Sequence, residues 1–331
     1  MSKVAFIAPA VNQELYNHGK QLFEHSIAGT AHVLDADFWS GDHCSPNYRD
    51  LEEYDYVFIN ENCEMYQLTI DLREGLPPKT KVIGYADGAY QDLTRMPFMP
   101  HGMLLIKMLK TVDAFVTLVE DAVGYYKLFT DKPVAYLGMP FPYEKKVRQF
   151  QIPLEQKREK WIAVAGQLTH CPLKNCIGNL FLTKKAEKVK ILFLEPQPDK
   201  VKSFLDENNF AVAIHNHIVQ DDFFKEYSRC YIGINLDPLG SLGRFSLDLA
   251  GMGIPVIGGP AQQHQKMLFP QLTFEPFLEV PKIVSAYQKL FSDLGFYNEC
   301  RDYALHIIET EITNEKFMVR WNNIKELVNN V

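Results

Sequence analysis

The chain has 331 residues, which is enough for about two domains that each bury a core of their own. Apolar residues make up 47% and charged residues 23%, a balance typical of globular proteins that argues against a disordered or fibrous chain. The net charge of −7 disfavours broad electrostatic capture of nucleic acid or of an anionic membrane, although it leaves room for a local basic groove.

No apolar run approaches the roughly 20 residues that span a bilayer, so we expect no membrane span. The short apolar run near the N-terminus predicts a buried strand rather than a secretory leader, and we expect a cytoplasmic protein. The cysteines are scattered at spacings that match no common zinc motif, which predicts free thiols in a reducing compartment; they are Cys44, Cys63, Cys171, Cys176, Cys230 and Cys300.

The first half of the chain alternates short apolar runs with helical patterns. Runs of this kind predict strands that are buried on both faces of a parallel sheet. The predicted strands cover residues 4–8, 32–34, 56–60, 81–85, 114–118 and 134–137. Helices are predicted between them, at residues 13–26, 102–111 and 120–129. This alternation predicts βαβ units in a doubly wound sheet.

A charged stretch around one proline, at residues 143–161, interrupts the alternation. Strands are then predicted at residues 161–165, 190–194, 211–215, 230–234 and 255–258. We therefore predict two Rossmann-like α/β domains that face a central cleft, at residues 1–145 and 161–311, joined by a solvated linker at residues 146–160. A C-terminal helical segment at residues 312–331, which opens with Thr313, is predicted last and could pack back on the first domain.

Two pairs of polar residues near predicted strands are candidate ligand sites. Asp35 and Asp37 follow the expected second strand, but no Gly-x-Gly-x-x-Gly precedes them, so plain strand-end carboxylates are favoured over a ribose contact. His215 and His217 alternate along a strand and would face the same side. Because no third metal ligand stands out, a strand end that touches a ligand in the cleft is favoured over a metal site, and we predict no bound metal.

The segment GSLGRFSLDLAGMGIPVIGG, residues 240–259, predicts a small-residue loop that leads into a helix and then into a buried strand. The free N–H groups and the positive end of that helix would attract a phosphate, with Ser241 as a donor and Arg244 as a bidentate clamp. Asp248 lies one turn further along the same face, where an ordinary ion pair with Arg244 is the simpler interpretation. A carboxylate beside a phosphate site is favourable when ribose hydroxyls donate to it, so the combination suggests a nucleotide diphosphate.

A second loop, at residues 166–175, follows the first strand of the second domain and precedes a helix. Gly166 allows the chain to turn there, and Lys174 could reach an anion at the helix N-terminus. On spacing alone, a plain strand-to-helix connection remains the simpler interpretation.

Taken in order, these motifs resemble those of GT-B nucleotide-sugar glycosyltransferases, in particular the retaining group related to glycogen and sucrose synthases. The resemblance covers most of the chain and is carried by VAGQLTHCPLKN, by DDFFKEYSRCYIGIN, by DLAGMGIPVIGG and, more weakly, by KPVAYLGMPFP in the first domain. It implies that Lys174 contacts the donor diphosphate and that Asp248 contacts the donor ribose. This chain departs from the family at Gln167, where the family has an arginine, and at Gly240, where the family has a sugar-binding acid.

The resemblance implies a metal-independent glycosyltransferase that needs no cofactor and uses a nucleotide sugar, with UDP-sugar favoured, as co-substrate. The implied donor contacts are Gly166, Gln167, Lys174, His217, Ser241, Leu242, Gly243, Arg244 and Asp248. Arg244 and Lys174 would stabilise charge on the leaving diphosphate. An inverting enzyme would also need a base in the first domain, for which Asp87 is the best candidate, unless it only forms a turn with Gly88. His101 and His170 are weaker candidates for the cleft.

Several functions remain open on the sequence alone. The acceptor could be a glycan, a small molecule or a hydroxylated base in DNA, as in phage-type DNA modification. Because Gln167 and Gly240 replace family residues, a non-catalytic nucleotide-sugar binding protein is a further alternative. An epimerase or a nicotinamide-dependent enzyme is also compatible with this kind of fold.

Overall fold

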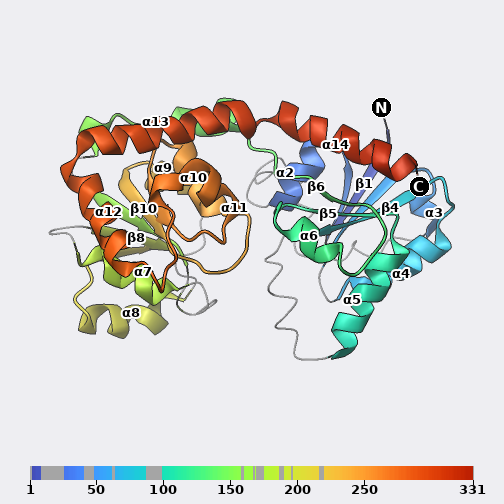
Figure 1. The fold of residues 1–331 in the computed structure, drawn as a ribbon, viewed down its shortest axis with the longest axis horizontal. Coiled ribbons are helices and arrows are strands. Elements are labelled where there is room, and N and C mark those ends of the chain that lie inside the picture. Colours follow the sequence, from blue (N-terminus) through green and yellow to red (C-terminus); the bar gives the residue numbers. More distant parts are fainter. Residues whose placement is uncertain are drawn as a thin grey trace. The chain divides into compact units, whose positions relative to one another are not determined.

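The computed structural model describes residues 2–8, 26–40, 48–61, 64–86, 99–157, 160–166, 168, 175–185, 190–194, 197–215 and 220–330. The chain forms two compact units, of which unit 1 comprises Met1–Phe141 with Ile312–Val331 and unit 2 comprises Pro142–Glu311. Figure 1 shows their helices and strands and labels those for which there is room. Each unit contains a parallel sheet with helices packed on it, so the α/β class and the two Rossmann-like domains are confirmed.

The sheet of unit 1 has the strand order β2-β1-β3-β4-β5-β6, and all of its strand pairs are parallel. Its strands are β1 (Val4–Ala8), β2 (Asp37–Ser40), β3 (Tyr56–Asn60), β4 (Lys81–Ala86), β5 (Ala114–Thr117) and β6 (Val134–Tyr136). The helices are α2 (Ser26–Val33), α3 (Tyr48–Leu51), α4 (Tyr66–Gly75), α5 (Met99–Thr111), α6 (Ala122–Tyr126) and α14 (Asn314–Asn329). Strands β1 and β3 are buried along their whole length, as continuous apolar runs predict.

The strand predicted at residues 32–34 is wrong. These residues belong to the end of α2 and the turn after it, and Asp35 takes a left-handed conformation with φ of 52°. The strand begins only at Asp37, whose Oδ2 accepts a hydrogen bond of 2.6 Å from the Tyr54 hydroxyl. Asp37 therefore stands at the amino end of β2, away from the edge where ribose-binding acids of such sheets lie.

The C-terminal helix α14 packs back on the sheet of unit 1. The Trp321 ring lies 5.1 Å from the rings of both Tyr56 and Phe58, measured between centroids. Arg320 Nε donates a 2.7 Å hydrogen bond to the carbonyl of Leu137. The hydroxyl of Thr313 caps the helix by accepting from the N–H of Lys316.

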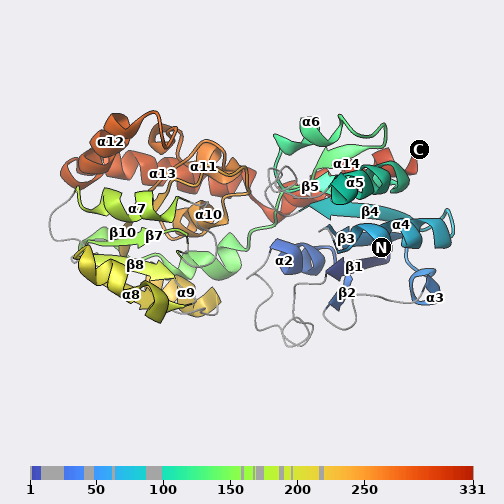
Figure 2. The same cartoon turned by 90° about the horizontal axis from the view of Figure 1, so that it is seen from below.

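The sheet of unit 2 has the strand order β11-β10-β7-β8-β9, again with every pair parallel. Its strands are β7 (Trp161–Val164), β8 (Lys190–Leu194), β9 (Val212–His215), β10 (Cys230–Asn235) and β11 (Val256–Gly258). The α-helices are α7 (Cys176–Thr183), α8 (Pro198–Glu207), α9 (Gln220–Tyr227), α10 (Arg244–Gly251), α11 (Gln263–Leu268), α12 (Val280–Ser292) and α13 (Leu294–Glu311). In Figure 2, α7, α12 and α13 lie on one side of this sheet, and α8 and α9 lie on the other.

Three short helical turns precede β7, at Tyr143–Val147, Arg148–Phe150 and Leu154–Gln156. They fall mostly within the range where a linker is predicted, and they belong to unit 2. Val147 and Lys157 are buried there, and Gln151 Nε2 donates a 2.9 Å hydrogen bond to the carbonyl of Gly251. Among the described residues, no helix is both long and apolar enough to cross a bilayer.

Candidate functional site

The order of strands in unit 2 creates a switch point between β7 and β10. The chain runs from β7 outward to β8 and β9, and then returns to place β10 on the other side of β7. In open α/β sheets, ligands bind in the crevice outside the carboxyl ends of the strands at such a point. The loop that leaves β7 at Gly166 and the loop that leaves β10 at Leu236 therefore flank the expected binding position.

Buried Asn179 of α7 ties these two loops together. Its Nδ2 donates to the carbonyl of Ala165 at 3.1 Å, and its Oδ1 accepts from the N–H of Leu236 at 2.9 Å. Asn175 adds a 3.2 Å hydrogen bond from Nδ2 to the carbonyl of Leu236. Sequence analysis missed Asn179, because an asparagine inside a short helix carries no signal that it joins two distant loops.

The loop that leaves β10 at Leu236 is hydrogen-bonded to the segment at residues 259–264. The N–H of Ser241 donates to the carbonyl of Ala261 at 3.2 Å, while the carbonyls of Ser241 and Leu242 accept from Gln263 and His264 at 2.9 and 3.0 Å. Both backbone groups of Ser241 hold the loop in place, so the group that Ser241 can offer a ligand is its side-chain hydroxyl.

Inside the same loop, Asp237 accepts from the N–H of Leu239 at 2.9 Å, as in an Asx turn. Asp237 is buried, as is Gly240, so this acid fixes the shape of the loop three residues before the glycine.

Helix α10 begins at Arg244, directly after Gly243, which has a φ of +78°. A Cβ on Gly243 would lie 3.2 Å from the Cβ of Gln262, so the tight turn into the helix favours glycine for both backbone and space. The first N–H groups of a helix lack intrahelical acceptors and form the positive end of its dipole. The sequence placed the helix start and its glycine within a residue or two of where they occur.

Arg244 and Asp248 form an ion pair, with Arg244 Nε 2.7 Å from Asp248 Oδ1. The Asp248 side chain is 10% exposed and that of Arg244 is 24% exposed. Burial raises the pKa of Asp248, while the Arg244 guanidinium beside it works in the opposite direction. The pair uses one of the five N–H donors of arginine, and the other four belong to its two terminal amino groups.

The remaining predicted residues divide between described and undescribed parts of the chain. Gly166 takes a φ of +99°, and its Cα faces Cys176 at the start of α7, so the expected turn is present. His101 lies within α5, and His215 is the last residue of β9. Four predicted contacts lie outside the described residues: Asp87, Gln167, Lys174 and His217, as does His170. The described cysteines, Cys176, Cys230 and Cys300, are buried, and no disulfide joins them to one another.

Unit 1 contains a carboxyl group that sequence analysis overlooked. Glu61 directly follows β3, and β1 and β3 flank the switch point of the first sheet. Its Oε1 accepts a 2.9 Å hydrogen bond from the Thr69 hydroxyl, and its Oε2 is enclosed with no hydrogen-bond partner among the described residues. Burial raises the pKa of Glu61 to about 8, against the weaker opposite effect of Thr69. At neutral pH, Glu61 is therefore mostly a neutral acid that can donate a hydrogen bond.

Within the described part of the chain, no three His, Cys, Asp or Glu side chains gather as a metal site would require.

Comparison with solved structures identifies the fold. No protein-family model and no curated protein matches the sequence. The structure is similar to sucrose-phosphate synthase from Thermosynechococcus elongatus, with a TM-score of 0.73, 11% identity and 100% of both chains covered. It is also similar to Anabaena HepE in complex with UDP-glucose, with a TM-score of 0.74, 9% identity and 100% of both chains covered. A third match is an α-glucosyltransferase in complex with UDP-glucose and DNA containing an abasic site, with a TM-score of 0.66, 11% identity and 99% of both chains covered.

The chain therefore has the GT-B glycosyltransferase fold, as its ordered motifs indicate. At identities of 9–11%, the likeness establishes the fold and leaves donor and acceptor to be argued from the residues of this chain.

Proposed function

We propose that this protein is a glycosyltransferase that moves a sugar from a nucleotide diphosphate sugar, with UDP-sugar favoured, to an acceptor hydroxyl. The observation that carries the proposal is the start of α10, where Gly243, Arg244 and Asp248 stand beside the switch point of the second sheet. The end-to-end likeness to the complex of HepE with UDP-glucose supports a UDP-sugar donor.

In this proposal, the donor diphosphate lies at the N-terminus of α10. The Arg244 guanidinium and the Ser241 hydroxyl donate to its oxygens, and Leu242 and Gly243 shape the backbone that approaches it. Lys174, Gly166, Gln167 and His217 would complete the donor site. The positive charges of Arg244 and Lys174 would stabilise the charge that develops on the leaving diphosphate, a role that a metal ion would otherwise fill.

Asp248 would accept hydrogen bonds from the ribose hydroxyls. In the structure, Asp248 Oδ1 accepts a hydrogen bond from Arg244 Nε. When the donor binds, the N–H groups of Arg244 would therefore be shared between the phosphate and Asp248. Because Asp248 is buried, hydrogen bonds from the ligand would lower the free energy of its charged form.

The acceptor would meet the carboxyl ends of β3 and β4 in unit 1, where Glu61 and Asp87 follow their strands. If the reaction inverts the anomeric centre, Asp87 is the proposed base that takes the acceptor proton. A retaining reaction would require no such base.

The donor test combines two substitutions with a matched control. Wild type, Arg244→Ala and Asp248→Asn are titrated with UDP, UDP-glucose and other nucleotide sugars, and UDP release is measured. Loss of a charged hydrogen bond predicts a rise of about 10- to 100-fold in the Kd of the best donor for each variant. Arg148→Ala is the control, because Arg148 also pairs with an acid four residues away, at 2.8 Å, but on an exposed surface. Unchanged donor affinity in both site variants would refute the assigned site.

DNA is a second candidate acceptor because of the match to the α-glucosyltransferase bound to UDP-glucose and DNA. The net charge of −7 works against binding to a phosphate backbone. Transfer from UDP-glucose to hydroxymethylated DNA, compared with transfer to free sugars, distinguishes these acceptors. Tight donor binding with no transfer and no UDP release would instead indicate a nucleotide-sugar binding protein.

A further inference from the structure

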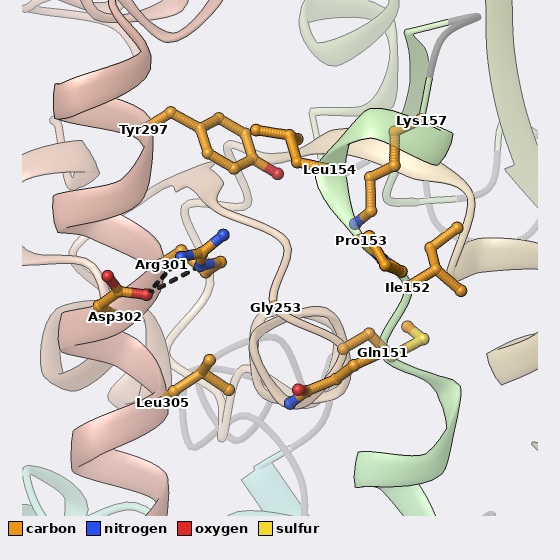
Figure 3. A pocket seen from close by; sticks show the side chains of 11 residues that line it. Gln151, Ile152, Pro153, Leu154, Lys157, Gly253, Tyr297, Arg301, Asp302 and Leu305 are labelled. Carbon is orange, nitrogen blue, oxygen red and sulfur yellow. Dashed lines mark hydrogen bonds and ion pairs between the residues drawn. The ribbon is translucent and has the colours of Figure 1, made fainter.

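A pocket lies entirely within unit 2, with a volume of about 380 Å³ (Figure 3). Three elements enclose it: the segment from Gln151 to Lys157, the turn at Met252 and Gly253 that follows α10, and one face of α13 that carries Tyr297, Arg301 and Leu305. This volume falls within the range of small-molecule sites in proteins. The pocket adjoins the C-terminal end of α10, whereas the candidate donor site adjoins its N-terminal end, roughly 12 Å away for eight residues of helix.

Lys157 contributes a buried cation to this pocket. The residue is only 4% exposed, and its Nζ has no hydrogen-bond partner among the described residues. Burial lowers its pKa to about 8, and the charge of Arg301 acts in the same direction. A buried ammonium without a partner costs free energy that an anion at the same place would recover.

Arg301 brings a second cation from α13. The group is partly neutralised by Asp302, which lies 2.8 Å from both Nε and Nη2 of Arg301. Lys157, Arg301 and Asp302 are the three charged residues among those that line the pocket, so the lining carries one net positive charge when Lys157 is protonated. Two cations close enough to disfavour each other's charge make a site that an anion stabilises.

Local contacts hold the walls of the pocket in place. Gln151 Nε2 donates to the carbonyl of Gly251 at 2.9 Å, and the Tyr297 hydroxyl donates to the carbonyl of Tyr231 at 2.8 Å. Gly253 takes a φ of +69°, and a Cβ there would lie 3.5 Å from Cδ of Arg301, so this side chain packs over the turn. The other lining side chains are mainly apolar: Ile152, Pro153, Leu154, Met252 and Leu305.

We propose that this pocket binds a small organic anion, whose carboxylate or phosphate accepts hydrogen bonds from Lys157 and Arg301 and whose apolar part packs against the remaining wall. The cations select the charged end of the ligand, and the apolar side chains exclude an inorganic ion as the best occupant. The proposal does not depend on the donor site.

The test uses isothermal titration calorimetry of the full chain with benzoate, phenyl phosphate and benzyl alcohol. Benzoate or phenyl phosphate is expected to bind, and benzyl alcohol, which lacks the charge, is expected to bind at least about 10-fold more weakly. The stronger of the two anions identifies the preferred head group. If neither anion binds at up to about 10 mM, the proposal is overturned.

Two variants move the affinity in opposite directions, so a folding defect cannot explain both results. Lys157→Met should weaken anion binding by about 10-fold or more, and Asp302→Asn should tighten it, because the competing carboxylate is removed. Equal affinity of wild type and Lys157→Met would overturn the assignment. Displacement of the probe by UDP would also overturn it, since the probe would then occupy the donor site.

Discussion

Replacing Lys157 by methionine should stabilise the ligand-free protein. Methionine is similar in length, tolerates an irregular apolar site and carries no charge to bury. The ordinary lysine pKa of 10.5 falls to about 8 in the folded protein, because of burial and of Arg301, with Cys230 as an opposing influence. At about 1.36 kcal/mol per pH unit, this difference corresponds to at most about 3.4 kcal/mol of unfolding free energy at pH 7.

The stability difference between Lys157→Met and wild type should also change with pH in a defined direction. Between pH 8 and 10.5 the unfolded chain binds the lysine proton and the folded chain does not, so the contribution of Lys157 to wild-type stability rises with pH. The advantage of Lys157→Met should therefore fall from about 3 kcal/mol at pH 7 to about 2 kcal/mol at pH 9, and approach zero above pH 10.5.

The assay is urea unfolding of both proteins at several pH values, followed by hydrogen exchange in peptides from β10 and α13, which report on unit 2 alone. Lys145→Met is the control, because Lys145 is an exposed lysine in the nearby turn Tyr143–Val147 and its loss should change stability by less than about 0.5 kcal/mol. A Lys157→Met protein that is less stable at pH 7, or whose advantage is the same at every pH, would refute the reasoning.

Three further outcomes are expected. Because the pKa of Glu61 is about 8, folded unit 1 keeps a proton that the unfolded chain loses, so the stability of unit 1 should decline as pH rises from 4.5 to 8. Glu61→Gln should remove most of that decline, and an unchanged dependence of stability on pH in this variant would contradict the prediction. Gly243→Ala should cost about 1–2 kcal/mol in urea unfolding and weaken UDP binding, because alanine is strained at a φ of +78°. Trp321→Ala should cost about 3–5 kcal/mol in the unfolding of unit 1, and a cost below about 1 kcal/mol would show that α14 is dispensable there.

The sequence predicts the central part of the proposed donor site because the residues of that part are contiguous. The glycine turn, Arg244 and Asp248 lie within one short stretch, and residues four apart on a helix share a face whatever surrounds them. Lys174 and Asp87, which lie in loops after predicted strands, stay predictions because they lie outside the described residues.

Strands that are buried on both faces are continuous apolar runs in the sequence, so the bounds of β1 and β3 were predicted correctly. The prediction at residues 32–34 was wrong because two apolar residues, Val33 and Leu34, can end a helix as readily as they form a strand, and only the turn at Asp35 decides between them.

Other features depend on residues that are far apart in the chain. Glu61 differs from an ordinary surface acid only because the fold encloses its Oε2 and sets Thr69 beside it. Lys157 and Arg301 are 144 positions apart, and they come together only when the chain between them has folded into a sheet and its helices. Local sequence sets periodicity, turns and capping, and these determine the elements and the loop that we assign to the donor. The desolvation of a charge depends on what packs around it, so only the tertiary structure decided where this protein buries an acid and a lysine.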